Sequence, residues 1–221
     1  MKANFTTYVK KNHKFLFYKF VKSKFLINIL SLLGLFPYLF CKIQNKPYFG
    51  FYLMARQTWA TRKPYMQGLV KKEILGCKNQ EFKILEVGSY AGNSATTWAE
   101  AIKSSGHKFK IVCVDRWGSY VKPEKDMINK APMIMDKALE NDKIFKLFNY
   151  NISAAGISKM VTPIKGESDV ILPTLEKNSF NIVFIDASHY YSNVIKDLKN
   201  AEVLLKEGGI LCGDDLDLQR H

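Results

Sequence analysis

The chain has 221 residues, of which 47% are hydrophobic, so it can form one globular domain with an extension and need not be disordered. Its formal net charge is +13, but residues 1–80 hold 15 Lys and Arg against one acidic residue, whereas residues 81–221 hold 18 against 19. Because the basic excess belongs to the N-terminal region, nucleic acid is the weaker candidate partner and an anionic membrane surface the stronger.

The four cysteines are scattered along the chain and form no C-x-x-C pair, which argues against zinc ligation and disulfide bonds. We expect reduced thiols in a cytoplasmic protein. The four are Cys41, Cys77, Cys113 and Cys212.

The N-terminal segment combines lysines with aromatic residues over residues 1–24 and continues as 17 uncharged residues from Phe25 to Cys41. A bilayer span needs about 18 to 20 apolar residues. Three alternatives stay open: a peripheral helix lying on the inner membrane face through residues 1–46, a short spanning segment, or helices packed on the following domain. A cleaved signal peptide does not fit, because the basic region is too long and no A-x-A-like site follows.

Lys46 to Gly50 has a turn-like composition and predicts a boundary, which divides the chain into a basic helical extension, 1–50, and a domain, 51–221. Residues 51–74 are expected to be helical, with an interruption near Pro64. Within this helix Trp59, Arg62, Tyr65 and Met66 recur at helical spacing, and the simplest interpretation is that they cover a sheet.

The best-defined pattern is a buried parallel strand, Phe82 to Val87, followed by Gly88, Gly92 and a helix that starts near Ser94. The glycines allow the backbone to approach a ligand at the N-terminus of that helix. Since the G-x-G-x-x-G pattern of a dinucleotide site is missing, a nucleotide-like ligand without a diphosphate fits better.

Glu86-x-Gly88-x-x-x-Gly92 resembles motif I of the class I S-adenosylmethionine-dependent methyltransferases, and residues 85–94 resemble the metal-dependent catechol O-methyltransferase type. The resemblance covers about residues 56–217. It implies an α/β fold, a Rossmann-like doubly wound sheet with strand order 3-2-1-4-5. It also implies that S-adenosylmethionine is bound by Glu86, Gly88, Ser89, Tyr90, Gly92 and Ser94. In this family a helix before motif I helps close the pocket, which makes Trp59, Arg62 and Tyr65 secondary candidates.

A second strand, residues 108–115, ends in Asp115, where a carboxylate can accept hydrogen bonds from a ribose. The resemblance assigns Asp115 to the ribose of the adenosine group. Trp117 either stacks on the adenine or covers the sheet edge.

A helix is expected at about residues 134–148, a third strand at 159–165 and a short helix at about 170–175. The resemblance assigns Ser168 and Asp169, in the loop after the third strand, to the adenine. Alternatively, these two residues form the N-cap of the short helix.

A fourth strand ends at Asp186, a helix covers residues 192–205, and a glycine turn at 207–209 leads to a strand ending in Asp214 and Asp215. D-x-x-H-x-Y, starting at Asp186, resembles the macrocin and cephalosporin-tailoring branch of the superfamily. If the strands are neighbours, their carboxyl ends open on the edge that carries motif I, and the three aspartates converge.

Three converging carboxylates repel one another, so a cation is expected, and oxygen ligands select Mg²⁺ or Ca²⁺. The resemblance implies Mg²⁺ bound by Asp186, Asp214 and Asp215. In the catechol-type enzymes the residue that matches Asp215 is Asn. Alternatively, Asp214 and Asp215 only cap the next segment. The resemblance also places Asp186 in the cofactor-binding and catalytic site. It makes His189 a general base, at the position where the catechol-type enzymes have a lysine. A structural His189 that caps the following helix is the alternative.

Together these patterns predict Mg²⁺-assisted O-methylation of a hydroxylated small molecule or sugar. The alternatives are a non-catalytic membrane-associated binding protein with this fold and an RNA methyltransferase. Only six residues follow Asp215, whereas the family usually continues with strands 6 and 7, so we expect those strands to be missing here. Two alternatives stay open: the chain is a fragment, or the N-terminal extension covers the sheet edge that those strands would protect.

Overall fold

The computed structural model describes residues 24–50, 62–77, 81–119, 139–188 and 190–214. Its centre is a five-stranded parallel sheet with strand order β3-β2-β1-β4-β5. The predicted fold class and strand order are therefore confirmed. The strands are β1 (Phe82–Val87), β2 (Phe109–Asp115), β3 (Val161–Lys165), β4 (Phe180–Ile185) and β5 (Leu205–Gly213).

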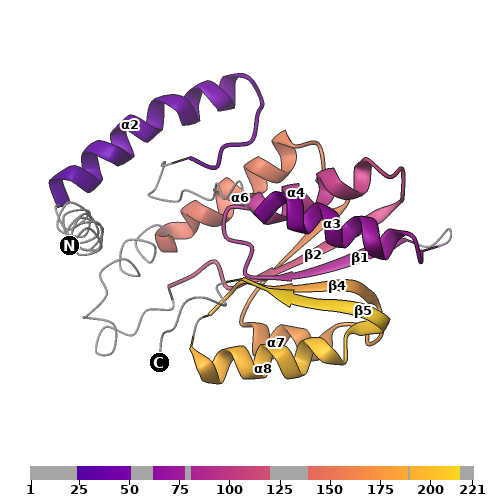
Figure 1. The fold of residues 1–221 in the computed structure, drawn as a ribbon. Helices are drawn as coiled ribbons and strands as arrows, with labels where there is room; N and C mark the ends of the chain where they lie inside the picture. Colours follow the sequence, from indigo (N-terminus) through magenta and orange to yellow (C-terminus); the bar gives the residue numbers. More distant parts are fainter. Residues whose placement is uncertain (1–23, 51–61, 78–80, 120–138, 189, 215–221) are drawn as a thin grey trace, which may run out of the picture.

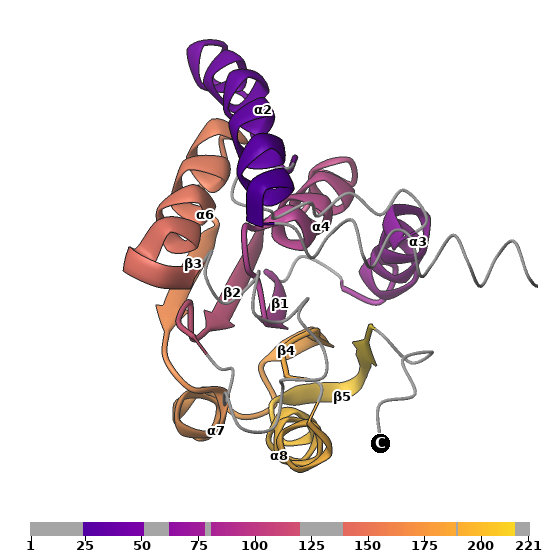
Figure 2. The ribbon, with the colours of Figure 1, turned by 90° about the vertical axis from the view of Figure 1, so that its left-hand side faces the viewer.

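Helices cover both faces of the sheet, as Figures 1 and 2 show. One face carries α3 (Arg62–Ile74), α4 (Asn93–Lys103) and α6 (Lys143–Ala154), and the other carries α7 (Ser168–Ile171) and α8 (Tyr191–Glu202). Two single-turn helices complete this part of the fold, η2 (Glu140–Asp142) and η3 (Leu172–Thr174). The N-terminal α2 (Lys24–Ile43) lies outside the α4 and α6 layer.

Alternation along β1 explains why both faces are apolar. Phe82 and Ile84 belong to the core cluster under α3, α4 and α6, whereas Leu85 and Val87 belong to the cluster under α7 and α8. Successive side chains of a strand point to opposite faces, so Glu86 shares the face of Ile84. This alternation directs the Glu86 carboxylate toward α4.

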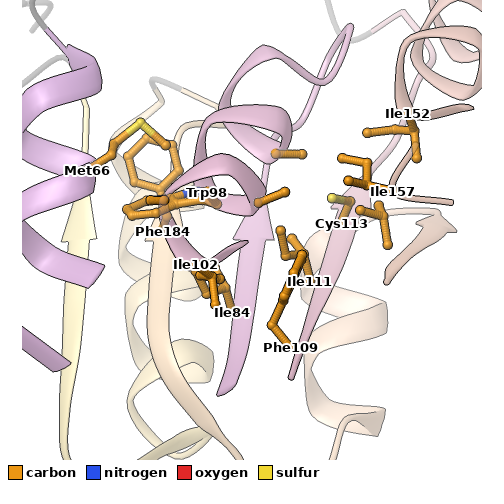
Figure 3. Packing of buried hydrophobic residues seen from close by; sticks show 14 of the residues in the cluster. Met66, Ile84, Trp98, Ile102, Phe109, Ile111, Cys113, Ile152, Ile157 and Phe184 are labelled. Carbon is orange, nitrogen blue, oxygen red and sulfur yellow. The ribbon is translucent and has the colours of Figure 1, made fainter. Parts of the chain in front are cut away.

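The larger core cluster is centred on Trp98 of α4, which is fully buried and meets Phe184 edge to face at 5.7 Å between ring centroids (Figure 3). Met66 of α3 packs beside this pair. The interpretation that this helix covers the sheet therefore holds for Met66. It fails for Tyr65, which is 77% exposed.

Several predicted boundaries are corrected. Helix α3 continues through Pro64, because proline in the first turn of a helix gives up no intrahelical hydrogen bond. The helix expected at 134–148 instead begins at Lys143, directly after two left-handed residues, Asn141 and Asp142, and it ends at Ala154. Residues 134–138 lie outside the described part. The short helix expected at 170–175 already begins at Ser168.

Strand β5 begins at Leu205, within the segment expected to be helical, because α8 ends at Glu202. The expected glycine turn lies inside this strand. There the register against β4 shifts between Phe180 and Ile182, and Gly208 has a φ of 75°. The turn is therefore a bulge between two paired parts of one strand.

Helix α2 is joined to the domain by tyrosines. Tyr38 lies edge to face against both Tyr48 and Tyr150, and the Tyr150 hydroxyl donates hydrogen bonds to the carbonyl oxygens of Cys41 and Lys46. Among the described helices, none has the length and apolar character that a membrane crossing requires.

Candidate active site

The loops that follow β1 and β4 are in direct contact at the carboxyl edge of the sheet. Gly88 has a φ of 91°, and a Cβ at this position would collide with the Asp186 carbonyl oxygen. Backbone hydrogen bonds join Gly88 N to the Val114 oxygen at 2.9 Å and Asp186 N to the Val87 oxygen at 2.8 Å. Only glycine fits both the conformation and the contact, so Gly88 sets the spacing of the two loops.

The Asp115 carboxylate joins the loops after β1 and β2. Its two oxygens accept hydrogen bonds from the backbone N–H groups of Tyr90, at 2.8 Å, and Trp117, at 2.7 Å. Burial raises the pKa of Asp115, and these backbone hydrogen bonds oppose the shift. Each carboxylate oxygen has a second lone pair, so Asp115 can hold the loops and still accept from a ribose hydroxyl.

Glu86 lies below the start of α4 and is fully buried. The Ser94 hydroxyl donates a hydrogen bond to its Oε1 atom at 2.9 Å. Burial, the largest cause, raises the pKa of Glu86 to about 7; the Ser89 and Ser94 hydroxyls oppose the shift, and the charges of Asp186 and Asp115 add to it. Within the described residues, no hydrogen bond of normal geometry reaches Glu86 Oε2. Because no part of Glu86 is exposed, a ligand at the glycine loop would not contact its carboxylate directly.

Gly92 is the N-cap of α4 and has a φ of 85°. A Cβ here would lie 3.0 Å from the Phe148 ring, so glycine keeps the turn both left-handed and close to α6. The expected helix start near Ser94 agrees with the observed start at Asn93.

Trp117 is enclosed by the protein. Its side chain is 1% exposed, packs on Phe145 and Phe148 at 4.7 and 4.8 Å, and donates through Nε1 to the Tyr90 oxygen at 2.7 Å. This geometry favours the alternative in which Trp117 covers the sheet over the one in which it stacks on adenine.

Ser168 and Asp169 are the first two residues of α7, and Glu167 is its N-cap. The alternative that these two residues form the N-cap is thus wrong by one position. Asp169 is exposed and lies 3.3 Å from Lys196 of α8. The two residues that the resemblance assigns to the adenine therefore lie at the start of the helix that follows the loop after β3.

Asp186 and Asp214 lie close together, as expected, but both pair with the side chain of Arg62. Arg62 of α3 donates to Asp186 at 2.9 Å through one terminal nitrogen and pairs with Asp214 through the other. The three side chains are between 20 and 31% exposed. The Arg62 guanidinium also lies 5.9 Å from the centre of the Phe184 ring, within the range of a cation–π interaction.

This arrangement corrects the expectation of unpaired carboxylates. The positive charge that the aspartates require is supplied by Arg62, and among the described residues no cluster of His, Cys, Asp or Glu is arranged to hold a metal. As described, Asp186 and Asp214 do not fit a preformed Mg²⁺ site. Three candidates, Trp59, His189 and Asp215, lie outside the described residues.

Asn151 of α6 was missed by sequence reasoning, because a lone asparagine in a helix carries no motif. It is fully buried. Its amide accepts from Tyr48 N at 2.8 Å and donates to the carbonyl oxygens of Tyr48, at 3.0 Å, and Ala91, at 2.9 Å. Asn151 therefore joins the segment after α2 to the glycine loop.

The strand order, the two left-handed glycines after β1 and the acid at the end of β2 are the features of a Rossmann-like fold that binds a nucleoside ligand. More specifically, the chain belongs to the methyltransferase domain family, whose model matches residues 85–216, more than half of the chain.

Solved structures share this fold at low sequence identity. The O-methyltransferase TomG from Streptomyces achromogenes, in complex with S-adenosylmethionine, is 18% identical, with a TM-score of 0.52 and coverage of 74% of this chain and 59% of TomG. The O-methyltransferase NovP is 16% identical, with a TM-score of 0.54 and coverage of 71 and 65%. The calicheamicin methyltransferase CalS11 is 16% identical, with a TM-score of 0.53 and coverage of 76 and 68%. No curated protein matches the sequence.

Proposed function

We propose that the chain transfers the methyl group of S-adenosylmethionine to the hydroxyl oxygen of a small molecule or sugar. The observation that carries this proposal is the joint anchoring of the loops after β1, β2 and β4 by Asp115 and by the contact between Gly88 and Asp186. Rigid loops at the carboxyl edge of a parallel sheet are the usual place for a nucleoside ligand. The names of TomG and NovP as O-methyltransferases support oxygen as the acceptor atom.

In the proposed site, Asp115 accepts from the ribose, the glycine loop follows the cofactor backbone, and Ser168 and Asp169 lie toward the adenine. Glu86, buried beneath the start of α4, would act on the cationic end of the cofactor through its charge and not by direct contact. His189 removes the proton of the acceptor hydroxyl. The oxygen then forms a bond to the methyl carbon as the carbon–sulfur bond breaks, and the electron pair of that bond remains on sulfur as S-adenosylhomocysteine.

For the acceptor end we propose that Arg62 supplies the positive charge at Asp186 and Asp214. Its two hydrogen bonds are accepted by carboxylate oxygens of Asp186 and Asp214, the same two side chains that would bind Mg²⁺. Binding of Mg²⁺ by Asp186, Asp214 and Asp215 therefore requires Arg62 to leave, and the metal-dependent branch of the superfamily remains a prediction for this chain.

Two further expectations remain proposals. The division into an extension, 1–50, and a domain, 51–221, is compatible with the contact of Tyr48 with Asn151, which attaches the end of the extension to the domain. A cytoplasmic location is supported by the four cysteines, all of which are free thiols.

The decisive experiment is calorimetric titration of the full chain with S-adenosylhomocysteine, beside Asp115→Asn and a matched control, Glu176→Gln. In Asp115→Asn an amide N–H₂ faces a backbone N–H, so we expect affinity to fall at least about tenfold, a loss of about 1.4 kcal/mol. Glu176 makes only an exposed contact with Lys83, so its variant should bind like the wild type.

The same protein is then incubated with S-adenosylmethionine and catechol, flavonoid and sugar acceptors while S-adenosylhomocysteine is measured. Turnover with one class names the acceptor. Failure of a folded protein to bind S-adenosylhomocysteine would overturn the proposal. Binding without turnover on these acceptors or on RNA would instead favour a non-catalytic binding protein.

A further inference from the structure

Helix α2 presents a continuous row of large apolar side chains to the solvent. Six residues, each between 43 and 84% exposed, form this apolar face: Leu32, Leu33, Phe36, Leu39, Phe40 and Ile43. Their spacing of three and four residues places them along one side of the helix. The other exposed large apolar residues are distributed over α3, the segment after it, α7, α8 and β5.

The opposite side of α2 is attached to the domain. Gly34 is buried, and its carbonyl oxygen accepts from the Tyr48 hydroxyl at 3.2 Å. Four residues later Tyr38 packs on Tyr48 and Tyr150, and after one more turn the Cys41 oxygen accepts from Tyr150. These contacts fix the rotation of the helix, so the apolar face is directed outward.

The charge of the surrounding sequence indicates what covers this face. Residues 1–46 contain nine lysines and no acidic residue, and Lys42 and Lys46 are exposed at the end of the apolar face. A second copy of the chain would bring two such segments together and is opposed by their repulsion. Anionic lipid headgroups instead attract the lysines while the acyl region accepts the apolar side chains.

We propose that the apolar face of α2 docks on an anionic lipid bilayer, with the helix lying in the membrane plane. In Figures 1 and 2 α2 lies outside the layer of α4 and α6, with the sheet on the other side of that layer. Docking would therefore place the membrane on the side of α2 that is turned away from the domain. This inference rests on α2 and on the charge of residues 1–46, and it does not depend on methyl transfer.

The test is co-sedimentation of the full chain with vesicles of phosphatidylcholine alone or mixed with phosphatidylglycerol. We expect binding to the mixed vesicles, weak binding to the neutral ones, and a decrease at high salt. The double variant Phe36→Asp/Phe40→Asp should lose at least about tenfold in affinity, because it places two carboxylates in the acyl region. The control is Leu75→Asp, at an apolar site just after α3 that is 84% exposed, which should bind like the wild type.

A second measurement does not require the double variant to fold. Phe36→Trp retains an apolar side chain, and its added fluorescence should shift to the blue on mixed vesicles and be quenched by brominated acyl chains. Binding to neither vesicle, or equal binding by a folded Phe36→Asp/Phe40→Asp protein, would overturn the proposal. So would a dimer in light scattering that the double variant abolishes, which would make the face a contact between two copies.

Discussion

Arg62 donates a hydrogen bond to the Asp186 carboxylate at 2.9 Å although 124 residues of sequence separate the two. The same guanidinium pairs with Asp214, so helix α3 is joined to the ends of both β4 and β5. This contact joins the carboxyl ends of β4 and β5 to α3 in an ion-pair network in which a protein side chain balances the carboxylates.

Removal of that side chain tests its role. Arg62→Ala leaves two partly buried carboxylates without a counter-charge, and we expect a loss of about 1 to 3 kcal/mol in the free energy of unfolding, measured with urea. Lys63→Ala, which removes only an exposed pair with Glu100, should cost less than about 1 kcal/mol.

A comparison of Arg62→Ala with the wild type also tests whether Arg62 or Mg²⁺ balances the two carboxylates. In Arg62→Ala the freed carboxylates can bind a divalent ion, so Mg²⁺ should raise the melting temperature of this variant and leave the wild type unchanged. Stabilisation of the wild type by Mg²⁺ to the same extent would contradict our assignment of the positive charge.

The raised pKa of Glu86 predicts how stability depends on pH. Between about pH 4.5 and pH 7 the folded protein keeps a proton that the unfolded chain has released, so the stability contribution of Glu86 falls as pH rises. The fall is at most about 3 kcal/mol and ends above about pH 7. Unfolding curves of Glu86→Gln should lack this component. Because Asp115 and Asp197 also have raised pKa values, the difference between wild type and variant is the quantity to compare.

Gly88→Ala probes the contact of the two loops. The substitution combines a left-handed backbone with a collision against the Asp186 carbonyl oxygen, so we expect a loss of about 3 kcal/mol or more and no binding of S-adenosylhomocysteine. Gly106 is the matched control: its φ of 75° is similar, but a Cβ there meets nothing within 4 Å. Gly106→Ala should cost about 1 kcal/mol. Equal effects of the two substitutions would show that the loop contact is unimportant.

Asn151→Ala removes the connection between Tyr48 and the glycine loop. Three buried backbone groups lose their partner, and we expect a loss of about 2 to 4 kcal/mol together with faster hydrogen exchange at Tyr48 N–H. Asn193→Ala, at an exposed position where the side-chain amide donates to the Ser188 hydroxyl, should change neither quantity measurably. Unchanged exchange in Asn151→Ala would mean that the extension is held by its tyrosines alone.

The strands, the glycine loop and the acids at the ends of β2 and β4 could be predicted from the residues, whereas the order of the strands was implied by the resemblance to a known family. The residue predictions depend on local physical rules: an apolar run marks a buried strand, a glycine marks a left-handed turn, and parallel strands bring their carboxyl ends to one edge.

The partners of these residues depend on contacts that form only when the chain is folded. Whether Asp186 and Asp214 face a metal or a guanidinium depends on the docking of α3, and whether Trp117 is open to a ligand depends on Phe145 and Phe148 of α6. The bulge in β5 is set by its pairing with β4, and the outward face of α2 by its contacts with Tyr48 and Tyr150. Such contacts join residues far apart in the chain, and the side chains that form them carry no periodic or turn signal in the sequence.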